Sequence, residues 1–165
     1  MAAGATYEPI ETRTLSSAID IVTFSSITGA YTDLILVISG AKAYQTNTFM
    51  RFNGDAGNNY SMTNMWGNGS AAVSNRYTSA QFIYIDLASP AANTVHTKIV
   101  QISNYSNTTT YKTSLTRDSS FDGEAFVGVG VWRNTAAITS ITITNANSYN
   151  WNVGTMFTLY GIKAA

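Results

Sequence analysis

The sequence predicts an all-β protein with one domain, folded as an antiparallel sandwich or barrel. Three observations lead to this fold class. Thr, Val, Ile, Tyr and Phe dominate the apolar stretches, whereas helix formers never cluster at helical spacing. Short strand-like runs recur at close intervals between turn residues, and the chain has only 2 prolines. A length of 165 residues fits a single domain that buries most of its apolar surface.

The strand-like runs differ in their expected environment. They span residues 18–24, 32–39, 48–53, 82–87, 97–103, 111–117, 126–132, 138–144 and 156–163. The run 32–39 is apolar on both faces, so we expect it inside a sheet. In 138–144, Ile141 and Ile143 alternate with threonines, which predicts one buried face and one wet face. Residues 105–113 fit either a polar loop or an exposed strand pair.

The run FVGVGVW places three valines on one face and Phe126, Gly128, Gly130 and Trp132 on the other. Two glycines between aromatic residues leave a groove that another side chain or backbone can approach closely. Either the domain's own aromatic residues or a neighbouring subunit would fill this groove. Gly128 and Gly130 are therefore interface candidates.

Composition excludes several classes of partner and chemistry. Nine basic and nine acidic residues cancel, and charged residues make up only 11% of the chain. No basic footprint for nucleic acid and no polybasic run for an anionic membrane is present. With no cysteine, disulfides, thiolate metal sites and cysteine nucleophiles are excluded. No apolar run reaches the roughly 20 residues of a membrane helix, and the N-terminal sequence is not a classical signal peptide.

The stretch RFNGDAGNNYS, residues 51–61, fits either a turn or a calcium loop. Calcium needs six to eight oxygen ligands, commonly several carboxylates, but this stretch supplies only Asp55 beside weak amide ligands. Asn-Gly pairs tolerate positive φ and build turns. We therefore expect a structural turn formed by Arg51, Asn53 and Asp55, with Arg51 and Asp55 paired across it. No metal or other cofactor is expected.

No catalytic constellation emerges from the sequence. His96 is the only histidine, no Gly-X-Ser-X-Gly elbow accompanies it, and we expect it on a strand face, hydrogen-bonded or solvated. Asp118, Asp122 and Glu124 resemble the acid pair of a glycosidase in composition alone. Their spacing favours a turn between two strands, with Arg117 as counter-charge. The sequence therefore predicts no enzyme.

Exposed aromatic residues offer a second kind of site. Trp66 lies in MWGNGS beside two glycines and an asparagine, so it would stack on a sugar, close one end of the core or lie in a subunit seam. Tyr44 and Trp151 would join it in a glycan site. The interface alternative selects Tyr7, Trp66, Tyr149 and Trp151 with the two glycines of the groove.

Four stretches together resemble a known set of proteins: residues 6–40, 51–61, 131–144 and 154–165. They are similar to tailed-bacteriophage virion proteins and to the C-terminal domains of phage fibre proteins. The matching positions are Phe24, Ile27, Tyr31, Asp33, Leu34, Arg51, Phe52, Asn53, Gly54, Asp55, Tyr60, Phe157, Leu159, Tyr160 and Gly161. Thr28-Gly29 departs from the pattern, which often has proline there.

The resemblance implies a jelly-roll sandwich, assembled as a homotrimer, that decorates a capsid or forms a fibre tip. Because the chain begins at Met1 without a long shaft, we expect a decoration or cement protein on the outer surface of the head. Its partners would be its own copies and the major capsid protein, and residues 1–14 would form an N-terminal arm against one of them. The alternative is a head-fibre or tail-fibre tip that binds host surface glycans.

Overall fold

The structure, a computed structural model, describes residues 6–86, 91–120 and 123–163. Its strands are β1 (Tyr7–Thr14), β2 (Ile21–Phe24), β3 (Asp33–Gly40), β4 (Thr48–Phe52), β5 (Tyr60–Gly67), β6 (Ala72–Ala80), β7 (Ile83–Tyr84), β8 (His96–Ser103), β9 (Lys112–Ser120), β10 (Ala125–Trp132), β11 (Ile141–Asn145) and β12 (Met156–Ile162). One short 3-10 helix, η1 (Ala146–Ser148), follows β11. This part of the chain has no helix with the length and apolar character needed to span a bilayer.

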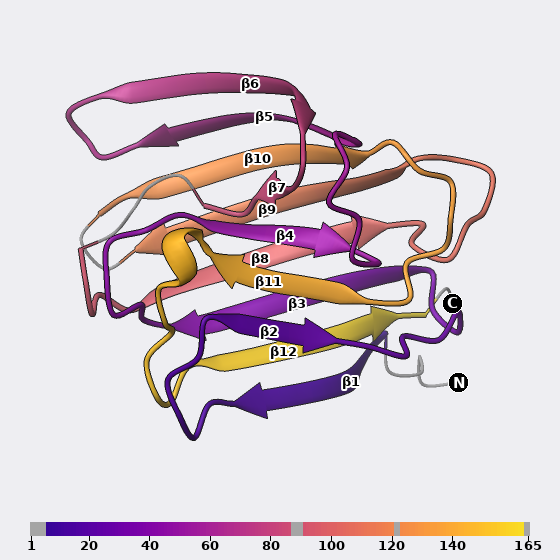
Figure 1. Ribbon diagram of the computed structural model, residues 1–165, viewed down its shortest axis with the longest axis horizontal. Coiled ribbons are helices and arrows are strands. Elements are labelled where there is room, and N and C mark those ends of the chain that lie inside the picture. Colours follow the sequence, from indigo (N-terminus) through magenta and orange to yellow (C-terminus); the bar gives the residue numbers. More distant parts are fainter. Residues whose placement is uncertain (1–5, 87–90, 121–122, 164–165) are drawn as a thin grey trace.

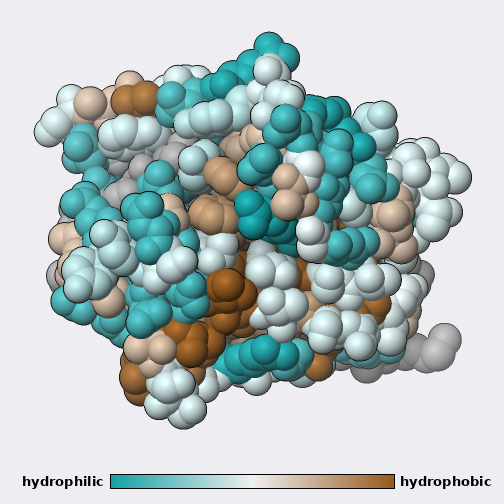
Figure 2. Space-filling model, viewed as in Figure 1, coloured by the Kyte–Doolittle hydropathy of each residue, from teal (hydrophilic) through white to brown (hydrophobic). Residues whose placement is uncertain are grey.

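The strands form two antiparallel sheets packed face to face (Figure 1). The larger sheet has the order β1-β12-β3-β8-β9-β10-β5-β6, and the smaller has the order β2-β11-β4-β7. This arrangement confirms the predicted all-β antiparallel sandwich. Seen from the side of the smaller sheet, the surface is largely hydrophilic or intermediate, with an apolar patch at the lower left (Figure 2).

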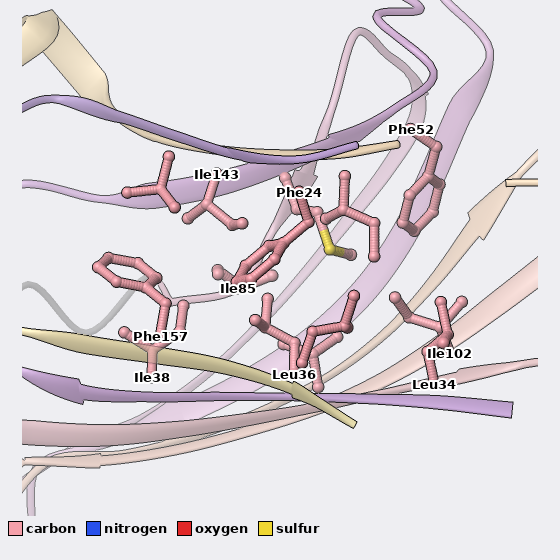
Figure 3. Packing of buried hydrophobic residues seen from close by; sticks show 14 of the residues in the cluster. Phe24, Leu34, Leu36, Ile38, Phe52, Ile85, Ile102, Ile143 and Phe157 are labelled. Carbon is pink, nitrogen blue, oxygen red and sulfur yellow. The ribbon is translucent and has the colours of Figure 1, made fainter. Parts of the chain in front are cut away.

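The apolar core lies between the two sheets (Figure 3). Leu34, Leu36 and Ile38 of β3 point into it, toward Phe24 of β2 and Ile143 of β11. All five are at most 1% exposed, so each contributes the full burial free energy of a large apolar side chain, about 1.5–3 kcal/mol. The period-2 alternation of these strands places the side chains on one face.

Each of the nine predicted runs contains a strand. The apolar run 32–39 becomes β3, which lies inside the sheet between β12 and β8 as expected. Ile141 and Ile143 are buried while the threonines between them are partly exposed, which confirms the predicted alternation. Residues 105–110 form a loop, of which Tyr105 is buried and Asn107 closes a turn through its side-chain oxygen.

The predicted N-terminal arm is wrong for the part of it that the structure describes. Residues 7–14 are β1, which pairs with β12 and forms one edge of the larger sheet. Pro9 fits this position because an edge strand leaves one row of N–H groups unused. Residues 1–5 lie outside the described residues.

The groove between the strand glycines is filled from inside the chain. A Cβ added to Gly128 would lie 2.9 Å from the ring of Phe126, and one added to Gly130 would lie 2.7 Å from Ile83. Both glycines are buried on the inner face of β10. Gly128 and Gly130 are therefore core positions, and their selection as interface residues is wrong.

Candidate functional sites

The 51–61 stretch is a structural turn, but Arg51 and Asp55 do not pair. Asn53 (φ 52°) and Gly54 (φ 67°) have left-handed backbones, and the Asn53 side chain accepts hydrogen bonds from Thr139 N and Ser140 N. Arg51 instead donates from Nε to the Gln81 carbonyl at 3.0 Å. Its guanidinium also lies over the rings of two phenylalanines.

Asp55 ties the turn to the core. Its Oδ2 accepts a bond of 2.7 Å from Trp132 Nε1, and its Oδ1 accepts one of 2.8 Å from Gly57 N. Asn59 donates to both oxygens. Burial raises the pKa of Asp55, but these bonds outweigh it and lower the pKa below its usual value. Both carboxylate oxygens thus serve the fold.

The predicted aromatic site does not assemble. Trp151 is fully buried, packed edge-to-face on Phe157 with the ring centres 5.1 Å apart. Trp66 is half-buried on β5, where it lies opposite Phe126. Tyr44 is exposed and stacks on Tyr149 at 4.6 Å. Trp151 is therefore neither an interface nor a glycan residue, because the core encloses it.

A cluster of five buried ionisable side chains, which we call the ionic cluster, joins the two sheets. Its members are Lys42, Asp86, His96, Lys98 and Asp118, each at most 5% exposed. Lys98 Nζ lies 2.8 Å from Asp86 Oδ2 and 2.9 Å from Asp118 Oδ2, and it also contacts His96 Nδ1. Lys42 Nζ lies 2.9 Å from Asp86 Oδ2.

Asp86 is the centre of this cluster and its link to the smaller sheet. Its Oδ1 accepts a bond of 2.7 Å from the backbone N of Thr48 in β4, whereas Lys98 belongs to β8 of the larger sheet. Burial would raise the pKa of Asp86, but the charges of Lys98 and Lys42 and their hydrogen bonds lower it to about 2. Asp86 is therefore ionised at any physiological pH.

Burial also shifts the pKa values of His96 and Lys42. Burial lowers the pKa of His96; the Asp118 carboxylate, whose Oδ1 is 3.6 Å from Nδ1, opposes this shift, and Lys98 adds to it. Burial likewise lowers the pKa of Lys42 against the attraction of Asp86.

The same residues also have the composition of a metal site. Asp86, His96 and Asp118 offer ligand atoms that lie within 4.8 Å of one another. The Lys98 ammonium, however, contacts all three side chains, so it holds the position that a metal ion would take. The three side chains therefore suit the ammonium group of Lys98 better than a bound metal ion.

Sequence reasoning missed this cluster. Asp118 and Arg117 were expected together in a turn, but they lie on β9 with opposite directions, Asp118 inward and Arg117 outward. The sequence did contain an indication of it, because Lys98 alternates with the same period of two as Val100 and Ile102, the core residues of β8. Of the other predicted acids, Glu124 directly precedes β10 and Asp122 lies outside the described residues. At these levels of burial a substrate cannot reach the cluster.

The outer face of the larger sheet is the second candidate site. Strand register aligns two cross-strand rows in its centre: Tyr160, Ile35, Gln101, Leu115, Val129 and Thr63, and Thr158, Val37, Ile99, Arg117, Val127 and Met65. Aliphatic side chains make up half of the first row and, with Met65, four of the six positions of the second, and Val129 and Met65 are 50% and 57% exposed. A solvent-facing sheet face is ordinarily polar, so this one is unusual.

A shallow groove of about 280 Å³ lies on this face. Ile35, Val37 and Ile99 contribute aliphatic side chains to it, and Arg117 and Gln101 contribute polar groups. Two tyrosines also line it, Tyr160 and the sequence-selected Tyr7, which is 58% exposed. Tyr7 thus lies at the surface where a partner or ligand can contact it.

Comparison with known proteins adds little to this description. No protein-family model and no curated protein sequence matches the chain. Among solved structures, a mutant of alginate lyase Aly36B bound to an alginate tetrasaccharide has 10% identity and a TM-score of 0.37, over 93% of this chain and 80% of that one. The marine PL-14 alginate lyase from Aplysia kurodai has 8% identity and a TM-score of 0.34, over 84% and 72%. Likenesses this slight carry no inference about function.

Proposed function

We propose that this chain is a bacteriophage capsid decoration (cement) protein, a jelly-roll sandwich that binds the outside of the head as a homotrimer and stabilises the shell. The observation that supports this best is the outer face of the larger sheet. An apolar sheet face of this extent is costly to leave in water and is typical of a surface that contacts protein. The four stretches that resemble virion proteins supply the phage context.

A structural role also agrees with the state of the ionisable groups. A general acid or base must reach its substrate within hydrogen-bonding distance. The ionic cluster is enclosed, and its charges are already paired within the chain. The stack of the exposed Tyr44 on the partly buried Tyr149 offers a separate surface for contact between copies in the trimer.

Heads that lack the protein test this function. We expect them to release their genome at a lower temperature, or at a higher residual ionic strength during dilution, than complete heads. Adding back the purified chain should restore the difference. Depleted heads that are as robust as complete ones would exclude the cement role and leave decoration alone.

The glycan-binding alternative, a head-fibre or tail-fibre tip, is supported by one observation, the groove lined by Tyr7, Tyr160, Gln101 and Arg117. Aromatic rings with nearby amide and guanidinium donors suit a sugar ring and its substituents. A glycan array probed with the purified chain separates the two functions. Saturable binding abolished by Tyr160→Ala would favour the fibre-tip function over the cement function.

A further inference from the structure

The basic side chains divide into two groups by whether they have a partner. Seven of the nine make hydrogen bonds or ion pairs inside the chain: Arg13, Lys42, Arg51, Lys98, Lys112, Arg133 and Lys163. The remaining two, Arg76 and Arg117, have no hydrogen bond, ion pair or ring contact with any described residue. Both are exposed, and both project from the outer face of the larger sheet.

The register places the two free arginines at a defined separation. Arg117 is on β9 and Arg76 is on β6, three strands away, and their cross-strand rows are neighbours. With about 4.8 Å between strands and about 6.6 Å between rows, their Cα atoms lie roughly 16 Å apart. Val127, Val129, Thr63 and Met65 occupy the space between them.

The face is large enough for a stable protein contact. Eight strands span about 34 Å and seven residues of strand span about 23 Å, which gives roughly 800 Å². Standard interfaces bury about 800 Å² on each partner. The outer face therefore suffices for a specific complex by itself.

Charge decides which partner fits. Two copies packed face to face would bring four unpaired arginines together, whereas the one carboxylate that the described residues place on this face, Asp33, already accepts a bond from Asn104 N. Like charges opposed in this way disfavour association. We propose that the outer face of the larger sheet docks onto a protein surface of the capsid shell that is apolar in its centre and carries carboxylates opposite Arg76 and Arg117. This inference rests on the proposed function and identifies the surface that performs it.

The test measures binding of the purified chain to heads depleted of it. The double variant Arg76→Gln/Arg117→Gln should bind at least about tenfold more weakly and with less salt dependence. The control Arg13→Gln/Lys163→Gln removes the same two charges from exposed ion pairs elsewhere and should bind within about twofold of wild type. Val129→Asp should abolish binding, whereas Val129→Thr, which keeps the shape and strand preference, should retain it. Circular dichroism establishes that each variant is folded.

The outcomes separate this inference from the proposed function. If the wild-type chain binds heads and the arginine variant binds equally well, the docking face is wrong and the function stands. If the wild-type chain does not bind heads, both fail. Loss of self-association by light scattering in Val129→Asp, with head binding intact, would assign the face to a second copy. Arginine-dependent binding of a galacturonate hexasaccharide, with head binding intact, would assign it to an acidic glycan. Either result would overturn the inference.

Discussion

Replacing Lys98 with methionine tests the ionic cluster most directly, because methionine keeps the length of the side chain and removes only its charge. Lys98 Nζ makes two ion pairs, of 2.8 and 2.9 Å, with carboxylates that are at most 5% exposed. At an effective dielectric constant of about 20, each pair gains about 6 kcal/mol of gross attraction. Much of this offsets desolvation, and removing one member of such a cluster costs about 3–5 kcal/mol. We expect that loss for Lys98→Met.

Lys112→Met is the matched control. Lys112 lies on the neighbouring strand, faces inward and is as buried as Lys98, but its Nζ donates only to the carbonyls of Thr110 and Thr135. These bonds are partly buried, so water can replace the ammonium as donor. We expect a loss below about 2 kcal/mol. The two variants have the same substitution at equally buried positions of the same sheet, but only Lys98→Met removes an ion-pair partner from Asp86 and Asp118.

Urea unfolding followed by tryptophan fluorescence gives both values, since Trp132 and Trp151 are enclosed in the native state. The pH dependence provides a second readout. Without Lys98, Asp86 keeps only Lys42 as a lysine partner, so burial raises its pKa above the wild-type value, and protonation at low pH then relieves part of the uncompensated charge. The stability difference between wild type and Lys98→Met should therefore shrink as the pH falls toward about 4. Equal losses for the two methionine variants, or a difference independent of pH, would refute an electrostatic role for the cluster.

Three further predictions follow from the buried contacts. The pKa of His96 is lower in the folded state than its unfolded value of 6.5, so its contribution to stability is complete above pH 6.5 and is lost as the pH falls through the folded pKa. Urea unfolding should therefore give a lower free energy of unfolding at pH 5 than at pH 7. In His96→Asn this part of the pH dependence should disappear. Asp55→Ala leaves Trp132 Nε1 unpaired in the core and should cost about 1–3 kcal/mol, whereas an unchanged melting temperature would show that water replaces the carboxylate. Gly161→Ala places a Cβ against the ring of Tyr31 and should cost about 1–3 kcal/mol by thermal unfolding, unless the ring moves aside freely.

The fold class was predictable because apolar residues alternate with polar ones along the central strands, with the period of two that a half-buried β-strand requires. Three strands were missed, β1, β5 and β6, and the reason is physical. β1 and β6 are the edges of the larger sheet, where charge, proline and short polar side chains protect against unwanted pairing. β5, next to that edge, alternates Met62 and Asn64 inward with Thr63 outward, so hydropathy gives no clear period.

The sites were less predictable than the fold. Trp151 and Trp66 were selected because aromatic residues suit both cores and interfaces, and composition alone cannot separate these environments. Lys42, Asp86 and Lys98 come from three distant segments, and only the pairing of β3 with β8 and the packing of the two sheets bring them together. The local sequence shows that Lys98 faces the core, but it does not show the carboxylates that compensate for the burial of its charge.

The ionic cluster and the outer face of the larger sheet both depend on the pairing of β8 with β9. Lys98 lies opposite Asp118 and Ile99 opposite Arg117, so the inward ion pair and the outward arginine depend on one register. A slip of one residue would turn Arg117 into the core and Asp118 out to solvent, so that Arg117 is buried without a partner and Lys98 loses one of its two carboxylates. An aliphatic pair in place of Lys98 and Asp118 would remove the lysine–carboxylate part of this penalty and leave the cost of burying Arg117. On this hypothesis a Lys98→Met protein that remains folded populates more than one register and gives doubled amide resonances in β8 and β9. A single set of resonances would mean that the core side chains alone determine how the outer face is presented.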